Sequence, residues 1–224
     1  MSYSVAVRAL CEFSAKVGDL DLRFTPSPTA QEGIEGHRRV VARRAAGYES
    51  EIALEGQFDT LKVRGRADGY DPACNRLEEI KTHRGDLSRQ PANHRQLHWA
   101  QAKVYGWLMC QARQMPAIEV ALVYLDVDSD GQTLISEHCT AAELQAFFET
   151  QCQRFLAWAQ GQEQRLAERN LGLQALGFPY PAFRQGQRQL AETLYKAVST
   201  GRCLMAQAST GIGKTVGTLF PLLK

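Results

Sequence analysis

Asp68, Glu79 and Lys81 have the residue types and the spacing to form a metal-dependent hydrolytic site. Asp68 ends the alternating stretch 61–68, and Glu79 and Lys81 lie in the next strand-like stretch, 77–82. Because side chains alternate along a strand, Glu79 and Lys81 share one face, and Asp68 lies near them if the two strands pair. Carboxylate oxygens suit Mg²⁺ or Mn²⁺, and a lysine can orient a water and offset charge on a phosphorus centre under attack. The spacing alone fits an exposed cross-strand ion pair equally well.

A second chemical motif lies near the C-terminus, where residues 208–215 read A-S-T-G-I-G-K-T. This fits a phosphate-binding loop with alanine in place of the first glycine, in which backbone N–H groups surround the phosphates and Mg²⁺ sits on the threonine hydroxyl. A predicted short strand over 202–207 and a helix after the loop supply the expected context. The predicted nucleotide-binding residues of the loop are Gly211, Gly213, Lys214 and Thr215.

Only nine residues follow Thr215. A motor also needs an acidic metal ligand on another strand and further strands to complete its parallel sheet. We therefore expect a loop that binds ATP without competent hydrolysis, as in a fragment of a longer protein.

The elements that must position these residues follow from hydrophobic periodicity and turn signals. Strands are predicted over 49–70, with a turn near 57–60, and over 77–82, 118–127 and 133–139. Helices are predicted over 29–44, over 92–114, and from a capping box at 140–143 through Trp158 toward Ala167. The pattern changes near 171–181, where the stretch 176–181 breaks helices and reads as a linker, and a helix over 184–199 follows it. The prediction is an α/β fold with a mixed central sheet flanked by helices.

Composition and charge place few limits on the partner. The chain has 224 residues, of which 44% are hydrophobic and 22% charged, as in a globular protein with one ordinary core and a remainder. A net charge of +2 permits nucleic-acid binding without arguing for it. The six cysteines are scattered, and no apolar run approaches membrane-spanning length. We therefore expect a soluble cytoplasmic protein with reduced thiols and no membrane partner.

Two further patterns are weaker. The stretch 126–137 matches the calcium loop of an EF-hand letter by letter, but its strand-like flanks favour a hairpin turn at Asp130–Gly131. His94 and His98 are one helical turn apart but have no evident third zinc ligand, so a solvated or DNA-facing helix surface is favoured.

The order of four motifs resembles a nuclease family. Asp68 followed by Glu79-Ile80-Lys81 looks like the core of the PD-(D/E)XK nucleases, particularly their RecB-like branch. That branch also carries an upstream histidine on a helix and a downstream Q-x-x-x-Y, which His37 and the stretch 101–105 match here. Gln101 and Tyr105 are four residues apart and share one helix face. One such motif is weak, but four in this order are specific.

The resemblance covers about residues 5–158 and implies the PD-(D/E)XK nuclease fold. It implies that Mg²⁺ or Mn²⁺ is bound by His37, Asp68 and Glu79. It implies catalytic roles for Lys81, Asp68 and Glu79, with Gln101 and Tyr105 supporting the site or contacting DNA. Ala67 replaces the proline of the family name. Some members of the branch hold an iron–sulfur cluster, but the cysteines here lack the close pairing, so no cluster is predicted.

The C-terminal part resembles a different family. Phe178-Pro179-Tyr180, then Phe183-Arg184-Gln185-Gly186-Gln187 and the phosphate loop, look like the start of XPD/DinG-like superfamily 2 DNA helicases. The resemblance implies that Gln187 helps to read the adenine of ATP. We predict two domains, a nuclease over 1–172 and a linker with an incomplete helicase ATPase over 173–224.

The functional prediction is a metal-dependent DNA nuclease that forms the N-terminal part of an ATP-dependent helicase-nuclease in DNA repair or processing. Its expected partners are ATP and DNA, single-stranded or with single-stranded ends. One alternative is an adaptor whose nuclease-like fold binds DNA for the motor without cutting it. Another is an ATPase with a purely structural N-terminal domain.

Overall fold

The computed structural model describes residues 2–18 and 27–224. The chain divides into two compact units, Met1–Trp158 and Ala159–Lys224. The boundary between them lies within the long helix α4 (Ala141–Ala175), so the predicted domain boundary at residue 172 stays a prediction.

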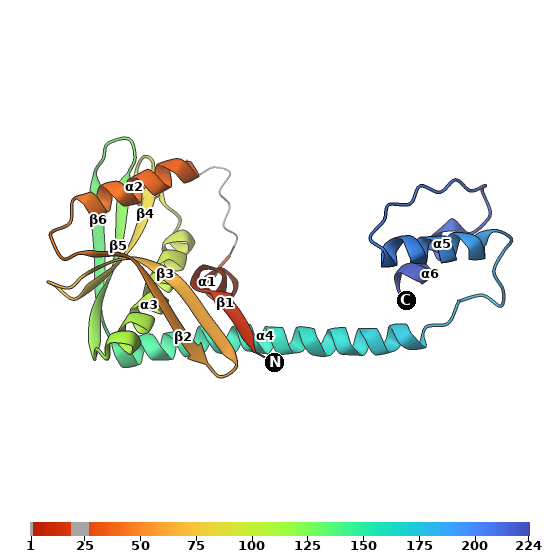
Figure 1. The fold of residues 1–224 in the computed structure, drawn as a ribbon. Helices are drawn as coiled ribbons and strands as arrows, with labels where there is room; N and C mark the ends of the chain where they lie inside the picture. Colours follow the sequence, from red (N-terminus) through yellow and green to blue (C-terminus); the bar gives the residue numbers. More distant parts are fainter. Residues whose placement is uncertain (1, 19–26) are drawn as a thin grey trace. The chain divides into compact units, whose positions relative to one another are not determined.

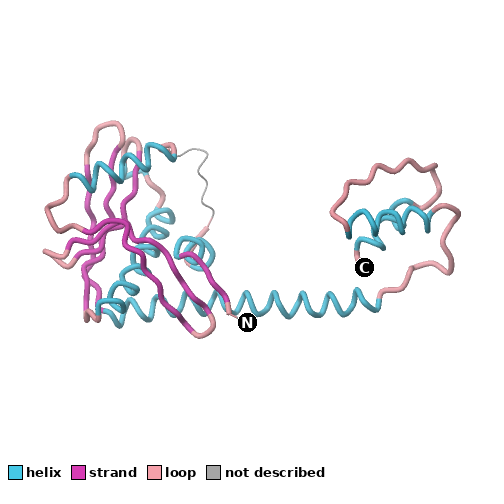
Figure 2. Tube along the Cα trace, in the orientation of Figure 1, coloured by secondary structure: helices cyan, strands magenta, loops and turns pink. Residues whose placement is uncertain are grey.

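The first unit is built on a mixed six-stranded sheet (Figures 1 and 2). The strand order is β1-β3-β4-β5-β6, and β2 pairs with β3 off this path. The β1–β3 and β4–β5 pairs are parallel, and the others are antiparallel. The strands are β1 (Tyr3–Ala6), β2 (Glu49–Phe58), β3 (Leu61–Asp71), β4 (Arg76–His83), β5 (Ala117–Asp126) and β6 (Gln132–Thr140).

Helices cover both faces of the sheet, which confirms the predicted mixed α/β architecture. α1 (Val7–Ser14), α3 (Ala92–Arg113) and the start of α4 pack on one face, and α2 (Ala30–Ala42) packs on the other. Alternation along β5 divides its side chains accordingly. Leu122 and Tyr124 join the larger core with α3, whereas Val123 and Leu125 pack under α2 with Val40.

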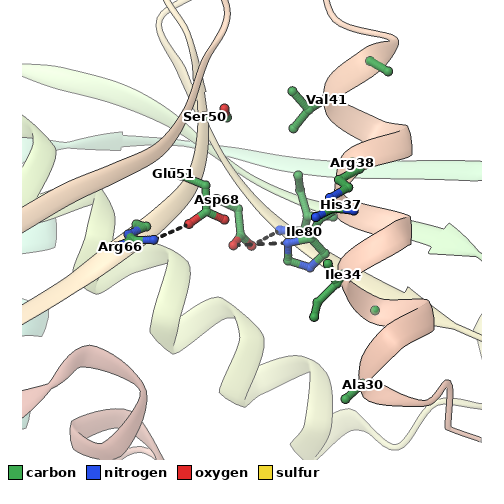
Figure 3. Close-up of a pocket in the computed structure, with 12 residues that line it drawn as sticks. Ala30, Ile34, His37, Arg38, Val41, Ser50, Glu51, Arg66, Asp68 and Ile80 are labelled. Carbon is green, nitrogen blue, oxygen red and sulfur yellow. Dashed lines mark hydrogen bonds and ion pairs between the residues drawn. The ribbon is translucent and has the colours of Figure 1, made fainter.

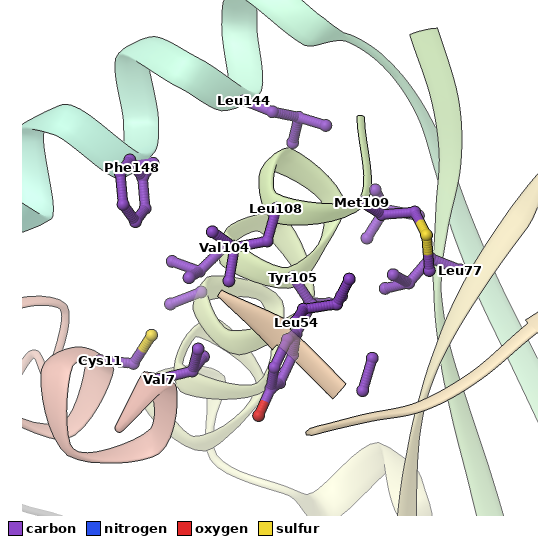
Figure 4. Packing of buried hydrophobic residues seen from close by; sticks show 14 of the residues in the cluster. Val7, Cys11, Leu54, Leu77, Val104, Tyr105, Leu108, Met109, Leu144 and Phe148 are labelled. Carbon is purple, nitrogen blue, oxygen red and sulfur yellow. The ribbon is translucent and has the colours of Figure 1, made fainter. Parts of the chain in front are cut away.

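The larger core lies between the sheet and the three helices (Figure 4). Val104 and Leu108 of α3 and Leu10 of α1 are fully buried, and Phe148 of α4 is 1% exposed. Burying a side chain of this size contributes about 1.5–3 kcal/mol. A Thr140–Glu143 capping box starts α4, with Thr140 N donating to Glu143 Oε2 at 2.8 Å, as predicted.

β3 is the strand on which the candidate site depends. β2 pairs along one of its edges from Leu61 to Tyr70, with the hairpin turn at the predicted place. The other edge is shared by β1, which pairs with residues 61–64, and β4, which pairs with residues 69–71. Within the described residues no strand pairs with 65–68 on that edge, so the sheet opens there.

Gly69 of β3 lies where only glycine fits. A Cβ at this position would overlap the Tyr48 hydroxyl, which donates to Glu78 Oε2 at 2.9 Å. Glu78 is fully buried and also accepts from Arg44 Nε at 2.8 Å.

We expect Gly69→Ala to lower the free energy of unfolding by about 1–3 kcal/mol, because overpacking must displace Tyr48 from a buried carboxylate. Urea unfolding followed by circular dichroism measures this. Gly172→Ala is the control, because a Cβ there meets nothing within 4 Å in helix α4. Equal stability of the two variants would contradict the prediction.

The acidic stretch matching a calcium loop forms the β5–β6 hairpin turn, as predicted from its strand-like flanks. Two of its carboxylates pair with arginines. Asp130 pairs with Arg39 and Arg43 of the α2 region, and Asp128 accepts from Arg84 Nε at 3.0 Å. The acidic residues therefore attach the hairpin turn to its neighbours.

The second unit comprises the end of α4, α5 (Gln187–Ser199) and α6 (Lys214–Leu222). The predicted strand over 202–207 is wrong, because this stretch is irregular. A strand needs neighbouring N–H and C=O partners, and the described part of this unit contains no other strand. The predicted helix break over 176–181 is confirmed, because α4 ends at Ala175 and no helix resumes before Gln187. No helix among the described residues is long and apolar enough to cross a membrane.

Candidate metal site and phosphate loop

Asp68 lies where β3 and β4 separate. Gly69 pairs with Glu78, but one residue further along, Asp68 and Glu79 are not paired. Instead, Asp68 Oδ2 accepts a hydrogen bond from the backbone N–H of Ile80 at 2.7 Å. The side chain of Asp68 thus takes the place of a backbone acceptor on β3. This hydrogen bond fixes the carboxylate of Asp68 at the opening of the sheet.

Glu51 of β2 stands opposite Asp68. Ser50 pairs with Gly69 and Ile52 with Ala67, so the residue between them, Glu51, faces Asp68 across the two strands. Glu51 has a φ of 55°, a left-handed conformation that is strained for a residue with a side chain. Like charges directly opposite on neighbouring strands repel. Glu51 Oε2 also accepts from Arg66 Nη1 at 3.2 Å, and this arginine offsets part of the repulsion.

His37 of α2 completes a group of three possible ligands. One ligand atom from each of His37, Glu51 and Asp68 lies within 4.8 Å of the others, and His37 Nδ1 lies 3.5 Å from Asp68 Oδ1 (Figure 3). Neighbouring ligands of Mg²⁺ lie about 3 Å apart in an octahedral shell. Small side-chain movements would bring all three onto one divalent ion, so the residues fit a metal of this class.

The pKa values of this group suit the same use. Burial, followed by the charge of Lys81, lowers the pKa of His37, which keeps the imidazole neutral and able to bind a metal. Burial, followed by the charge of Glu79, raises the pKa of Asp68 to about 8. The charged carboxylate is therefore disfavoured here without a cation.

Glu79 and Lys81 lie on the neighbouring part of β4 and bond to each other. Lys81 Nζ donates to Glu79 Oε1 at 2.6 Å and to Gln101 Oε1 of α3 at 3.0 Å. Burial acts to lower the pKa of Lys81, but the charges of Glu79 and Asp68 outweigh it and raise the pKa, so the ammonium stays protonated.

The predicted site residues therefore form two adjoining groups. His37 and Asp68 line a hollow of about 750 Å³ together with Glu51. Lys81 and Gln101 line a second hollow of about 310 Å³. Glu79 lies with Lys81, and its predicted role as a metal ligand stays a prediction.

Tyr105 of α3 packs against β3 where the sheet opens. It is 8% exposed, and its ring lies against Gly65 of β3, where a Cβ would come within 2.5 Å of the hydroxyl. Gln101, one turn earlier, holds Lys81. The Q-x-x-x-Y motif thus places one residue on each side of the opening.

Glu51 is the site residue that the sequence analysis missed. The signal was present in the predicted turn near 57–60, because a hairpin closed there pairs residues in a fixed order and places Glu51 opposite Asp68.

Removing the Glu51 charge is expected to weaken Mn²⁺ binding at least about 10-fold, in the range found when metal-site partners are lost. Isothermal titration of the Glu51→Gln variant with Mn²⁺ measures this. Glu55→Gln is the matched control, because Glu55 lies four residues along β2 and pairs with Lys62 at 2.9 Å. Unchanged Mn²⁺ affinity in Glu51→Gln would remove Glu51 from the ligand set.

In the second unit the glycine-rich loop precedes α6. Gly211 and Gly213 have φ values of 86° and 82°, left-handed conformations that glycine adopts freely. Thr215 lies in the first turn of α6. Lys214 Nζ donates at 3.0 and 2.9 Å to the carbonyl oxygens of Ala208 and Ser209.

Gln187 at the start of α5 is attached to this loop. It is 3% exposed, and its Nε2 donates to the carbonyl of Gly213 at 2.9 Å. Arg184 Nη1 donates to the carbonyl of Gly211 at 2.5 Å. The predicted nucleotide-binding residues thus lie together, although their ligand stays a prediction.

Comparisons with known proteins give a weak, local similarity to a helicase. No family model matches the chain. A probable ATP-dependent helicase of Methanocaldococcus jannaschii is 41% identical over 46 residues, which is 20% of this chain and 7% of that protein. The chain thus matches only a small part of that helicase. The crystal structure of SSO0001 is 21% identical, covers 68% of this chain and 77% of its own, and has a TM-score of 0.41, a likeness that assigns neither fold nor function.

Proposed function

We propose that the first unit is a divalent-metal-dependent deoxyribonuclease domain associated with an ATP-dependent helicase. The observation that carries the proposal is the convergence of His37, Glu51 and Asp68 beside the Lys81–Glu79 pair at an opening in the sheet. The local similarity to a helicase supports DNA and ATP as partners.

Each residue of the site has a different role in the proposed phosphodiester hydrolysis. Mg²⁺ or Mn²⁺ held by Glu51, Asp68 and His37 would supply charge neutralisation and activation of water. Lys81 remains protonated and offers its N–H groups to the phosphate oxygens on which charge builds. Gln101 orients the Lys81 ammonium, and the Ile80 N–H orients Asp68.

The test is incubation of the 224-residue chain with labelled single-stranded DNA and Mn²⁺. We expect cleavage that EDTA abolishes and that fresh Mn²⁺ restores. DNA binding without any cleavage above the EDTA background would favour the non-cleaving adaptor instead.

For the second unit we propose nucleotide binding at the glycine-rich loop. Lys214→Ala removes the one lysine of this loop and is expected to weaken binding of a fluorescent ATP analogue at least about 10-fold, because a charged hydrogen bond to phosphate contributes about 1.5–3 kcal/mol. Lys196→Ala, on α5, is the control. Metal-dependent cleavage by the first unit is expected to be unchanged, and equal analogue affinity of both variants would contradict nucleotide binding at the loop.

A further inference from the structure

The larger hollow contains more than the metal ligands. Ile34, His37, Arg38 and Val41 are spaced at i, i+3, i+4 and i+7, so they form one face of α2. This face lines the hollow, and Ile34 is 58% exposed, whereas Val41 also packs against the small core under α2. Figure 3 shows Ile34 and Val41 on the helix side, with Glu51, Asp68 and Arg66 on the strand side.

Two arginines lie at the same hollow. Arg38 is exposed and has no ion-pair partner among residues 2–18 and 27–224. Arg66 pairs with Glu51 at 3.2 Å. Glu51 is itself a proposed metal ligand, so a bound cation would compete for this carboxylate and leave the Arg66 guanidinium available. The hollow therefore offers a cation on each side, Arg38 on α2 and Arg66 on β3, and apolar side chains on the α2 side.

We propose that this hollow is a subsite for one unpaired nucleotide beside the phosphate that is cleaved. The base lies against Ile34 and Val41, and Arg38 and Arg66 bind the phosphates on its two sides. The proposal rests on the nuclease function above and names its substrate as single-stranded DNA.

The shape of the hollow argues for an unpaired base. A volume of about 750 Å³ is in the range of pockets that hold small molecules, and it accommodates one nucleotide. In a duplex each base is paired and stacked, and turning one out loses both interactions. An unpaired strand avoids most of that loss and gains contact with the apolar side chains of α2.

The experiment measures binding separately from cleavage. Fluorescence anisotropy of a labelled oligonucleotide, either single-stranded or in a duplex, measures DNA binding in the presence of Mn²⁺. All variants carry Lys81→Met so that the DNA is not cleaved, and Lys81 is suitable because it lines the other hollow. Circular dichroism confirms that each variant is folded. Ile34→Ala is expected to weaken single-strand binding about 10-fold, because the base loses apolar contact with this side chain, while duplex binding should change less than about 2-fold.

Further variants test the roles of Arg38 and of the Ile34 side chain that contacts the base. Arg38→Ala is expected to weaken single-strand binding and to reduce the slope of log affinity against log salt by about one. Ile34→Trp enlarges the apolar surface that contacts the base and is expected to tighten single-strand binding several-fold. Misfolding cannot produce such a gain. Leu134→Ala and Arg165→Ala, at an exposed leucine of β6 and an exposed arginine of α4, are the controls.

The possible outcomes distinguish failure of the nucleotide subsite from failure of the proposed nuclease activity. Equal effects of Ile34→Ala on single-stranded and duplex DNA, or none, would overturn the nucleotide subsite even if the unmodified chain cleaves DNA. A single-strand effect of Ile34→Ala without any cleavage by the unmodified chain would support the subsite and overturn the nuclease.

Discussion

Asp68→Asn is expected to reduce Mn²⁺-dependent DNA cleavage by at least about 100-fold, because it removes a charged ligand of the proposed metal ion. The asparagine oxygen can still accept from the Ile80 N–H, so the local backbone has its partner. Gel analysis of a labelled single strand measures cleavage, and isothermal titration measures the accompanying loss of Mn²⁺ affinity.

The same variant is expected to be more stable than the parent chain when no metal is present. Burial and the Glu79 charge raise the folded-state pKa of Asp68 from 3.8 to about 8, so the charged carboxylate costs stability. Because the pKa is raised, the contribution of Asp68 to stability is greatest below pH 3.8 and is lost as pH rises through about 8. In EDTA the advantage of Asp68→Asn should therefore grow from pH 4 to pH 8.

Asp59→Asn is the control for both measurements, because Asp59 is an exposed residue of the β2–β3 turn with a φ of 49°, which asparagine tolerates. Full cleavage activity in Asp68→Asn would exclude Asp68 from the reaction. Lower stability in EDTA at pH 8 would show that the Asp68 charge is compensated in the folded protein.

Lys81→Met is expected to reduce cleavage by about 100–1000-fold while Mn²⁺ affinity is retained, because the lysine acts on the phosphate and not on the metal. The variant is also expected to lose about 3–5 kcal/mol of stability, since Glu79 keeps a side chain only 6% exposed without its cation.

A second change separates the two effects of Lys81→Met. The double variant Glu79→Gln/Lys81→Met removes both charges and is expected to recover most of the stability without recovering cleavage. Urea unfolding and the cleavage assay give the two readings. Recovery of cleavage in the double variant would mean that the single variant failed only through loss of structure.

Much of the first unit follows from local sequence patterns. Alternation predicts β3, and an apolar run predicts β5. The turn signals predict both hairpins, and the Thr140–Glu143 box predicts the start of α4. These features depend on residues close in sequence, whose effects on the backbone act without the rest of the fold. The motif order also brought His37 and Asp68 together as predicted neighbours, and the structure places them 3.5 Å apart.

The tertiary structure decided what depends on distant segments. The sheet opens at 65–68 because β1 and β4 share one edge of β3, and no local pattern encodes that arrangement. The opening places Asp68 on the Ile80 N–H, and burial there raises its pKa. The stretch 202–207 has the residues of a strand but no partner in the described unit, so its backbone stays irregular.

By itself, the sequence determined which residues could perform metal-dependent chemistry and on which elements they lie. The tertiary structure decided which of them meet, adding Glu51 to His37 and Asp68 and pairing Glu79 with Lys81. The physical reason is that side-chain chemistry and strand alternation are local properties. Convergence, burial and the resulting pKa values depend on how strands and helices far apart in the chain pack together.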